Sequence, residues 1–370
     1  MDDRDELAAW LQLVETPHIG REAARKLLAA FGSPQTVLAA SFDSHCRVVS
    51  EAAARALRSP PAHFASLLER TLAWLADPTA PAARAVIALG DPRYPPRLLD
   101  TADPPLLLYA QGHLGLLHAD AVAIVGSRNP TPQGALNARD FAQALGAAGW
   151  VVVSGLALGI DGAAHEGALA AHAGTIAVVG TGLDRVYPKR HLDLAHRIAR
   201  DGLMLSEYAL GTPALAPHFP QRNRLIAGLS RGTLVVEAAL QSGSLITARM
   251  ALEAGREVMA IPGSIHAPQA RGCHALIKQG AKLVESAQDV LEELPVLAAT
   301  HPAAAATPTA NAPEDDALLS AMGHEVVSLE ALVARTGWSA SALNIRLLDL
   351  ELEGRVARLP GQLFQRIARA

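Results

Sequence analysis

Four short apolar runs, each ending at a small or polar residue and followed by a helix-like stretch, limit the fold of this chain more than any other feature. Continuous apolar strands that alternate with helices are typical of a parallel sheet buried on both faces. We therefore expect an α/β fold, with a ligand site where the strands end. The runs are Val122–Val125 before Gly126, Val151–Val153 before Ser154, Thr175–Val179 before Gly180, and Thr233–Val236 before Glu237.

Two other parts of the chain have a helical pattern. Residues 1–76 form a helical N-terminal domain, and the turn 17–20 looks like a helix-hairpin-helix, whose amides can hold a phosphate. We favour a structural hairpin, because this turn carries no basic residue. Residues 317–370 follow the order helix, turn, helix, hairpin, which predicts a winged helix.

The domain boundaries follow from composition. Residues 77–81 are rich in proline and separate the helical domain from the core, residues 85–295. Residues 296–316 are rich in alanine, proline and threonine, which predicts a flexible linker before the winged-helix domain, residues 317–370.

Charge and cysteine content constrain the partners and the compartment. The net charge is 32 − 36 = −4, so any nucleic-acid binding must come from a local cluster of cations. Two distant cysteines, Cys46 and Cys273, favour a reducing, cytoplasmic compartment. The acidic start does not resemble a signal peptide, and no apolar run approaches the ~20 residues that span a membrane. We expect no membrane association.

The segments after the strands carry the candidate binding residues. Glycine exposes backbone N–H groups, arginine can grip a phosphate with two N–H donors, and an aromatic ring can stack on a base. The densest cluster, His218 to Arg224, meets these needs, although Phe219 could instead anchor a loop, with both arginines in structural ion pairs. Arg224 in particular could pair with Glu237. The candidate DNA-binding residues are Gly126, Ser127, Arg128, Lys189, Phe219, Arg222, Asn223, Arg224, Ser242, Gly243 and Ser244.

Catalytic motifs are not found in the sequence. There is no P-loop, zinc spacing or nucleophile elbow, and Gly180-Thr181-Gly182 lacks the third glycine of a dinucleotide fingerprint. Asp161 and His165 share a helix face, but no third group is spaced to join them, so we favour Asp161 as a first-turn acid. We expect a protein that is not an enzyme, without catalytic residues, cofactor or metal.

The segments named above, in this order, resemble the DNA-processing protein A (DprA, also called Smf) family over most of residues 85–290. The resemblance implies an extended Rossmann-like core that binds incoming single-stranded DNA, protects it and loads the recombinase RecA during natural transformation. It implies a homodimer and a DNA pocket at Arg128, Phe219, Arg222 and Asn223, with Ser242–Ser244 nearby.

This chain departs from the family pattern at two places. Ala214–Ala216 stands where many relatives carry a basic residue, and His191 where they usually have asparagine.

Two alternative functions remain open. A Rossmann-like enzyme that cleaves nucleoside monophosphates could use Glu207 or Glu237 as acid or base. A transcription regulator would depend on the winged helix alone. Its second helix carries acidic residues around Arg346, which suit the major groove poorly.

Overall fold

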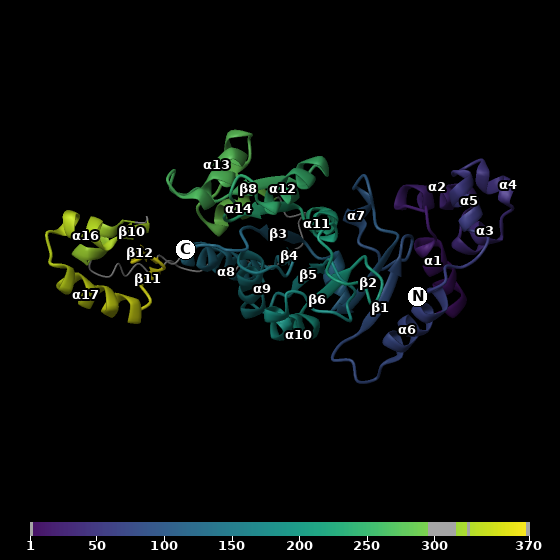
Figure 1. Cartoon of the computed structure of the whole chain (residues 1–370), viewed down its shortest axis with the longest axis horizontal. Helices are drawn as coiled ribbons and strands as arrows, with labels where there is room; N and C mark the ends of the chain where they lie inside the picture. Colours follow the sequence, from purple (N-terminus) through teal and green to yellow (C-terminus); the bar gives the residue numbers. More distant parts are fainter. Residues whose placement is uncertain (1–2, 295–315, 324–325, 368–370) are drawn as a thin grey trace.

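The computed structural model describes residues 3–294, 316–323 and 326–367. A helical unit lies at one end, an α/β unit in the middle, and a small unit of helices and strands at the other end (Figure 1). The expected linker, residues 296–316, lies outside the described residues apart from Asp316.

A sheet of nine strands within the described residues forms the middle unit, in the order β1-β2-β6-β5-β4-β3-β7-β8-β9. The strands from β6 to β9 in this order pair in parallel, and β1 and β2 add an antiparallel edge. The four runs of the sequence are β3, β4, β5 and β7, so the predicted α/β fold is confirmed. The strands are β1 Arg84–Ala88, β2 Leu107–Gly112, β3 Ala121–Val125, β4 Val151–Ser154, β5 Thr175–Val179, β6 Leu203–Ser206, β7 Gly232–Val235, β8 Glu257–Ala260 and β9 Lys282–Leu283.

The sheet reverses its direction of growth between β3 and β7. From β3 the chain adds β4, β5 and β6 on one side, and then returns to add β7, β8 and β9 on the other. Connections leaving two neighbouring strands in opposite directions open a crevice at their carboxyl ends. The fold therefore places its natural ligand site after β3 and β7.

Both faces of the sheet are covered, because successive side chains of each strand point to opposite sides. Val122 and Ile124 of β3 pack with α8 and α9, whereas Ala123 and Val125 pack with α11 and α12. Figure 1 shows these helix layers on the two sides of the sheet. The helices of the core are α7 Pro96–Leu99, α8 Pro132–Ala147, α9 Ile160–Ala170, α10 Leu192–Asp201, α11 His218–Leu229, α12 Gly243–Glu253, α13 Arg271–Lys278 and α14 Ala287–Glu293, with the short 3-10 turns η1 Leu114–His118, η2 Lys189–His191 and η3 Pro268–Ala270.

The N-terminal helices cover the β1–β2 edge of the sheet. Leu7, Leu11 and Leu27 form one cluster with Val86 of β1 and Tyr109 of β2. Serine and aspartate side chains cap four of the helix starts and satisfy N–H groups that the helices leave unpaired. The expected hairpin lies between the first two helices. The bounds are α1 Arg4–Glu15, α2 Arg21–Phe31, α3 Pro34–Ala39, α4 Phe42–Cys46, α5 Glu51–Ala56 and α6 Phe64–Ala76.

The C-terminal unit has the predicted winged-helix arrangement. Ser328 and Ser339 cap its second and third helices, and Gly337 ends the second in a left-handed conformation with φ of 70°. The three strands form one antiparallel sheet in the order β10-β12-β11. The elements are α15 Ala317–Met322, β10 Val326–Ser328, α16 Leu329–Thr336, α17 Ala340–Leu352, β11 Val356–Leu359 and β12 Leu363–Arg366.

Candidate functional site

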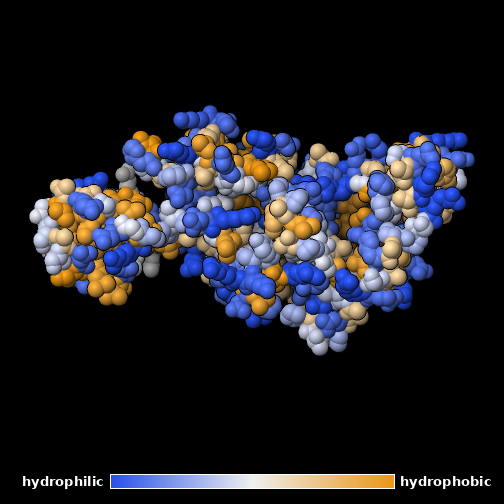
Figure 2. Space-filling model, viewed as in Figure 1, coloured by the Kyte–Doolittle hydropathy of each residue, from blue (hydrophilic) through white to orange (hydrophobic). Residues whose placement is uncertain are grey.

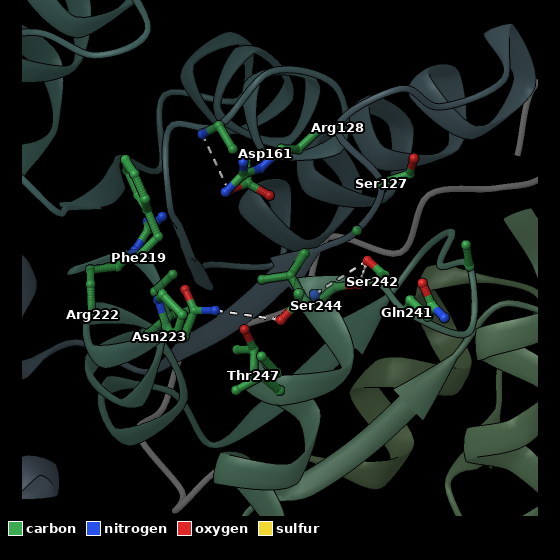
Figure 3. Close-up of a pocket in the computed structure, with 18 of the residues that line it drawn as sticks. Ser127, Arg128, Asp161, Phe219, Arg222, Asn223, Gln241, Ser242, Ser244 and Thr247 are labelled. Carbon is green, nitrogen blue, oxygen red and sulfur yellow. Dashed lines mark hydrogen bonds between the residues drawn. The ribbon is translucent and has the colours of Figure 1, made fainter. Parts of the chain in front are cut away.

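A pocket of about 540 Å³ opens at the reversal point, beyond the carboxyl ends of β3 and β7 (Figure 3). Four segments far apart in sequence line it: the loop after β3, the loop after β4, the first turns of α11 and the start of α12. Nine of the eleven candidate residues are among its lining: Gly126, Ser127, Arg128, Phe219, Arg222, Asn223, Ser242, Gly243 and Ser244.

Arg128 is held at the mouth of this pocket by backbone contacts of its neighbour. The Ser127 N–H donates to the Glu237 carbonyl over 2.7 Å, and the Ser127 carbonyl accepts from the Ile160 N–H over 3.1 Å. Arg128 itself is exposed, and within the described residues no carboxylate lies at ion-pair distance from it, although its charge is attracted by the buried Asp161 carboxylate. Its guanidinium carbon lies 5.5 Å from the centre of the Phe219 ring. A free cation thus stands over an aromatic face.

Phe219 occupies the first turn of α11 and packs over the end of β5. A side chain at Gly180 would begin only 3.3 Å from the Phe219 ring, so the glycine leaves room for it. The ring is half-buried, and the exposed ring of Tyr187 lies 5.5 Å away at an angle of 37°. This packing fixes the direction of the ring while one part of it stays open to the pocket.

Arg222, one turn further along α11, is placed differently from Arg128. It is only 4% exposed, and its Nη1 donates to the Val178 carbonyl. A Cβ atom at Gly155 would lie 1.8 Å from the same nitrogen, so the guanidinium fills the space that this glycine leaves. Arg222 therefore forms part of the pocket wall, and its direct reach to a ligand is smaller than that of Arg128.

A buried carboxylate balances this charge. Asp161 accepts hydrogen bonds from the N–H groups of Gly155 and Ala157, over 3.1 and 3.3 Å. Burial raises the pKa of Asp161 and lowers the pKa of Arg222 to about 10, and the attraction between the two groups opposes both shifts. Asp161 lies in the first turn of α9, as expected. His165, which shares a helix face with Asp161 in the sequence, is fully buried and forms a hydrogen bond with Thr175 instead.

Arg224, a candidate DNA-binding residue, does not line the pocket, and the alternative that it pairs with Glu237 is wrong. It forms an ion pair with Glu207 and donates to the Asp103 carbonyl over 2.6 Å. Residues two apart on a helix point about 200° apart. Arg222 and Arg224 therefore cannot serve the same side of α11.

Glu237 instead fixes the start of α8. Its carboxylate accepts from the Thr131 N–H over 2.9 Å and from the Thr131 hydroxyl over 2.6 Å. Burial raises the pKa of Glu237, although these two hydrogen bonds act in the opposite direction. With Glu207 held by Arg224, both glutamates of the enzyme alternative have structural partners.

The starts of α11 and α12 meet across the pocket floor. Ser242 caps α12, its hydroxyl accepts from the Ser244 N–H over 3.3 Å, and the Asn223 amide lies 3.5 Å from the Gly243 carbonyl (Figure 3). A helix N-terminus carries partial positive charge and free N–H groups, which favours an anion there. This end of the pocket is thus suited to a phosphate.

Lys189 does not line the pocket. It lies in η2, exposed, two residues after Tyr187, whose ring contacts Phe219. Sequence reasoning missed several lining residues, most of which lie close in sequence to the chosen ones, while Ala157 lies in the loop after β4. Their position beside the strand-end loops was the available signal: Asn129, Ala157, Pro220, Gln241, Ile246 and Thr247.

Among the described residues, no cluster of three or more histidine, cysteine, aspartate or glutamate side chains is arranged to bind a metal ion. In the same part of the chain, no helix combines the length and apolar character needed to cross a bilayer.

Comparison with protein families gives two matches. Residues 85–295 match the model of DNA recombination-mediator protein A, and residues 301–362 match the DprA winged helix domain. Protein Smf of Escherichia coli K12 is 42% identical over 82% of this chain and 82% of its own length. The DNA processing protein DprA of Streptococcus pneumoniae R6 is 53% identical over 55% of this chain and 72% of its own.

Two solved structures are also similar. The crystal structure of DprA from Streptococcus pneumoniae aligns with a TM-score of 0.67 and 38% identity, covering 80% of this chain and 99% of the other. A structure of DNA processing protein A from Helicobacter pylori, described by its single-stranded DNA binding mode, aligns with a TM-score of 0.52 and 32% identity over 56% of this chain and 94% of the other.

Proposed function

The chain belongs to the family of DNA recombination-mediator protein A, the DprA/Smf family, and on that premise we propose that it binds single-stranded DNA in the pocket at the reversal point. In this role it protects incoming DNA in the cytoplasm and loads the recombinase RecA during natural transformation. The solved relative from Helicobacter pylori, whose binding mode for single-stranded DNA is described, supports this proposal.

The observation that carries the proposal is the pairing of Arg128 with Phe219. A cation without a carboxylate partner stands over a half-buried ring, beside the N-terminus of α12. Single-strand binding needs charge for the phosphates and flat faces for the bases, and the overall charge of −4 cannot supply the former. Arg128 is the direct phosphate contact in this proposal, Phe219 the base contact, and Arg222 a fixed positive charge in the wall.

A binding role without catalysis agrees with the carboxylates near the pocket. Glu207 is paired with Arg224, Glu237 bonds Thr131, and Asp161 bonds two backbone N–H groups. A general acid or base must instead be free to exchange a proton with a substrate. We expect no turnover of ATP or of nucleoside monophosphates by the purified protein. Release of a free base that is lost in E207Q or E237Q would overturn this part of the proposal.

Homodimer formation and RecA contact belong to the same proposal. We expect the dimer interface to include Leu252 of α12 and Ile265 after β8, which are 56% and 73% exposed. Figure 2 shows orange, hydrophobic residues on this part of the surface, over α12 and α13. We expect the full chain to sediment as a dimer at micromolar concentration, and L252E with I265E to shift it to a monomer. A wild-type chain that stays monomeric would count against the dimer.

The winged helix supports a regulator of transcription less well. The exposed face of α17 carries Ile345, Leu348 and Leu352. Figure 2 shows orange, hydrophobic residues along the lower edge of this unit, where Figure 1 labels α17. Arg346 on the same helix is paired with Asp316. A helix that enters the major groove needs polar and cationic side chains for bases and phosphates.

Phe219 provides the test of the DNA site. Binding of single- and double-stranded DNA should be compared by fluorescence anisotropy across a salt series. F219A should weaken single-strand binding by about 1–3 kcal/mol with little change of salt slope, because stacking releases few counterions. F42A is a matched control, since Phe42 is half-buried in the N-terminal unit. Equal affinity of F219A and F42A in folded proteins would contradict the assignment.

A further inference from the structure

The aromatic surface of the pocket continues beyond Phe219. The Tyr187 ring lies 5.5 Å from the Phe219 ring, and Tyr187 is 49% exposed. Aromatic residues make up only 4% of the chain. Arg128, Phe219 and Tyr187 therefore form a row in which each member contacts the next, and the last member faces solvent.

The loop that carries Tyr187 is fixed at both ends. Near its start the Gly211 N–H donates to the Asp184 carboxylate over 2.8 Å, and the Thr181 hydroxyl donates to the Arg185 carbonyl over 3.0 Å. At its end the His191 Nδ1 lies 3.0 Å from the Leu156 carbonyl, to which it donates. A ring on an anchored loop loses little conformational freedom when it stacks on a base.

The same loop carries three exposed cations: Arg185, Lys189 and Arg190. Within the described residues, none of the three is close enough to a carboxylate to form an ion pair. By contrast, Arg197 and Arg200 on the following helix are paired with Glu166 and Asp201 over 2.8 Å. Unpaired cations on a rigid loop beside an aromatic ring have the composition of a single-strand binding surface.

We propose that residues 185–190 form a second binding surface for the strand that leaves the pocket. The base next to the one on Phe219 stacks on Tyr187, and Arg185 and Arg190 hold the phosphates that follow. This inference depends on the proposed function. The segment before Phe219, Ala214–Ala216, is exposed and uncharged, so the loop 185–190 supplies cations that this segment lacks.

The length of the DNA distinguishes the two surfaces. Anisotropy should be measured for the full chain with oligothymidylates of about four and about sixteen nucleotides, the range of single-strand site sizes. Y187A should weaken the long oligonucleotide roughly tenfold, the effect of one lost stack, and leave the short one unchanged. Y187F keeps the ring and should bind both lengths like wild type.

The cations give an independent readout. R185Q with R190Q should lower the salt slope for the long oligonucleotide by roughly 1.4, or 0.7 for each phosphate contact, and leave the slope for the short one unchanged. R58Q is the matched control, because Arg58 is an exposed arginine of the N-terminal unit. Thermal melting of each variant confirms that it is folded.

The outcomes separate this inference from the proposed function. If Y187A weakened binding of the short and the long oligonucleotide equally, Tyr187 would only support Phe219, and the proposed second surface would be overturned. Unchanged binding of the long oligonucleotide by Y187A and by R185Q/R190Q would also overturn it. If F219A weakened binding of neither oligonucleotide, the proposal that the pocket binds DNA would itself be overturned.

Discussion

The first turns of α11 border two cavities that differ in their charges. On one side is the pocket with Arg128 and Phe219. On the other is a groove of about 990 Å³ between α2 and the core, lined by residues that include Arg21, Arg25, His218 and Gln221. We call this cavity the α2 groove. It is the larger of the two and also offers a stacked pair of rings, Tyr208 and His218, 4.0 Å apart.

Counter-charges set the two cavities apart. In the α2 groove, Asp103 bonds Arg21 and Arg25 over 2.6 and 2.7 Å, and Glu207 pairs with Arg224. Two further carboxylates, Glu15 and Glu22, line the same groove. Its arginines therefore hold the helical unit against the core. Arg128 shares its pocket with the buried Asp161 carboxylate but forms no ion pair among the described residues, which leaves its N–H donors available to a ligand. The number of arginines near a cavity is a poor guide to DNA binding unless the carboxylates around them are counted.

Breaking the ion pairs of the groove should have the largest effect. R224M leaves Glu207, whose side chain is 10% exposed, with Arg21 at 3.4 Å as its remaining ion-pair partner among the described residues. Loss of one partner of a buried pair costs about 3–5 kcal/mol of unfolding free energy. R25M is the control, because its more exposed pair should cost about 1 kcal/mol or less. Denaturant titration measures both. A small effect of R224M would contradict the claim that the ion pairs of the groove hold the helical unit against the core.

A fall in pH should lower the stability of the protein through His165 on α9 sooner than through Asp103 in the α2 groove. Burial lowers the pKa of His165, which lies on α9 one turn after the pocket residue Asp161, to about 3. Below about pH 6.5 the His165 side chain takes up a proton in the unfolded chain, whereas in the folded chain it stays neutral. The stability that neutral His165 allows is therefore fully present above that pH and is lost as the pH falls. Burial raises the pKa of Asp103 in the groove, but its three arginines lower it further, so its contribution persists to about pH 4.

The pH prediction is tested with two variants. Between about pH 6.5 and 5 the wild type should lose about 1.7 kcal/mol in total that H165N does not lose, with a slope that approaches about 1.4 kcal/mol per pH unit towards pH 5. D103N should keep the wild-type slope in this range. An identical slope in wild type and H165N would show that His165 is protonated in the folded chain.

The salt dependence of DNA binding sharpens the comparison at a smaller scale. R128Q should lower the salt slope for single-stranded DNA by roughly 0.7, the value for one phosphate contact. R25Q should leave the slope unchanged, because Arg25 faces Asp103. If both substitutions lower the slope, strand binding extends into the groove and the distinction between the cavities fails.

The smallest effect is expected from the winged helix. Arg346 lies near three carboxylates, those of Asp316, Asp349 and Glu353, which places it with the groove arginines rather than with Arg128. A chain that ends at Leu294 should therefore bind single-stranded DNA within about twofold of the full chain at matched salt, since no phosphate contact is lost. A large loss of affinity would assign this unit a direct part in binding.

The fold and the edge of the sheet that bears the candidate site could be predicted from sequence, but the partners of individual side chains could not. Apolar runs predicted β3, β4, β5 and β7, and the loops after them supplied most of the pocket lining. The partners of Arg224 are Glu207 and Asp103, the latter 121 residues away, and no local pattern indicates such pairs. The burial of Arg222 likewise depends on Gly155, which belongs to another strand-end loop.

The contact between Gly155 and Arg222 has a genetic consequence. Because a Cβ atom at position 155 would overlap the guanidinium, the two positions cannot vary independently. G155A should be harmful beside arginine and tolerated beside a shorter residue at position 222. Selection for suppressors of G155A should therefore return substitutions at position 222, a reciprocal epistasis between two sites 67 residues apart in the printed sequence.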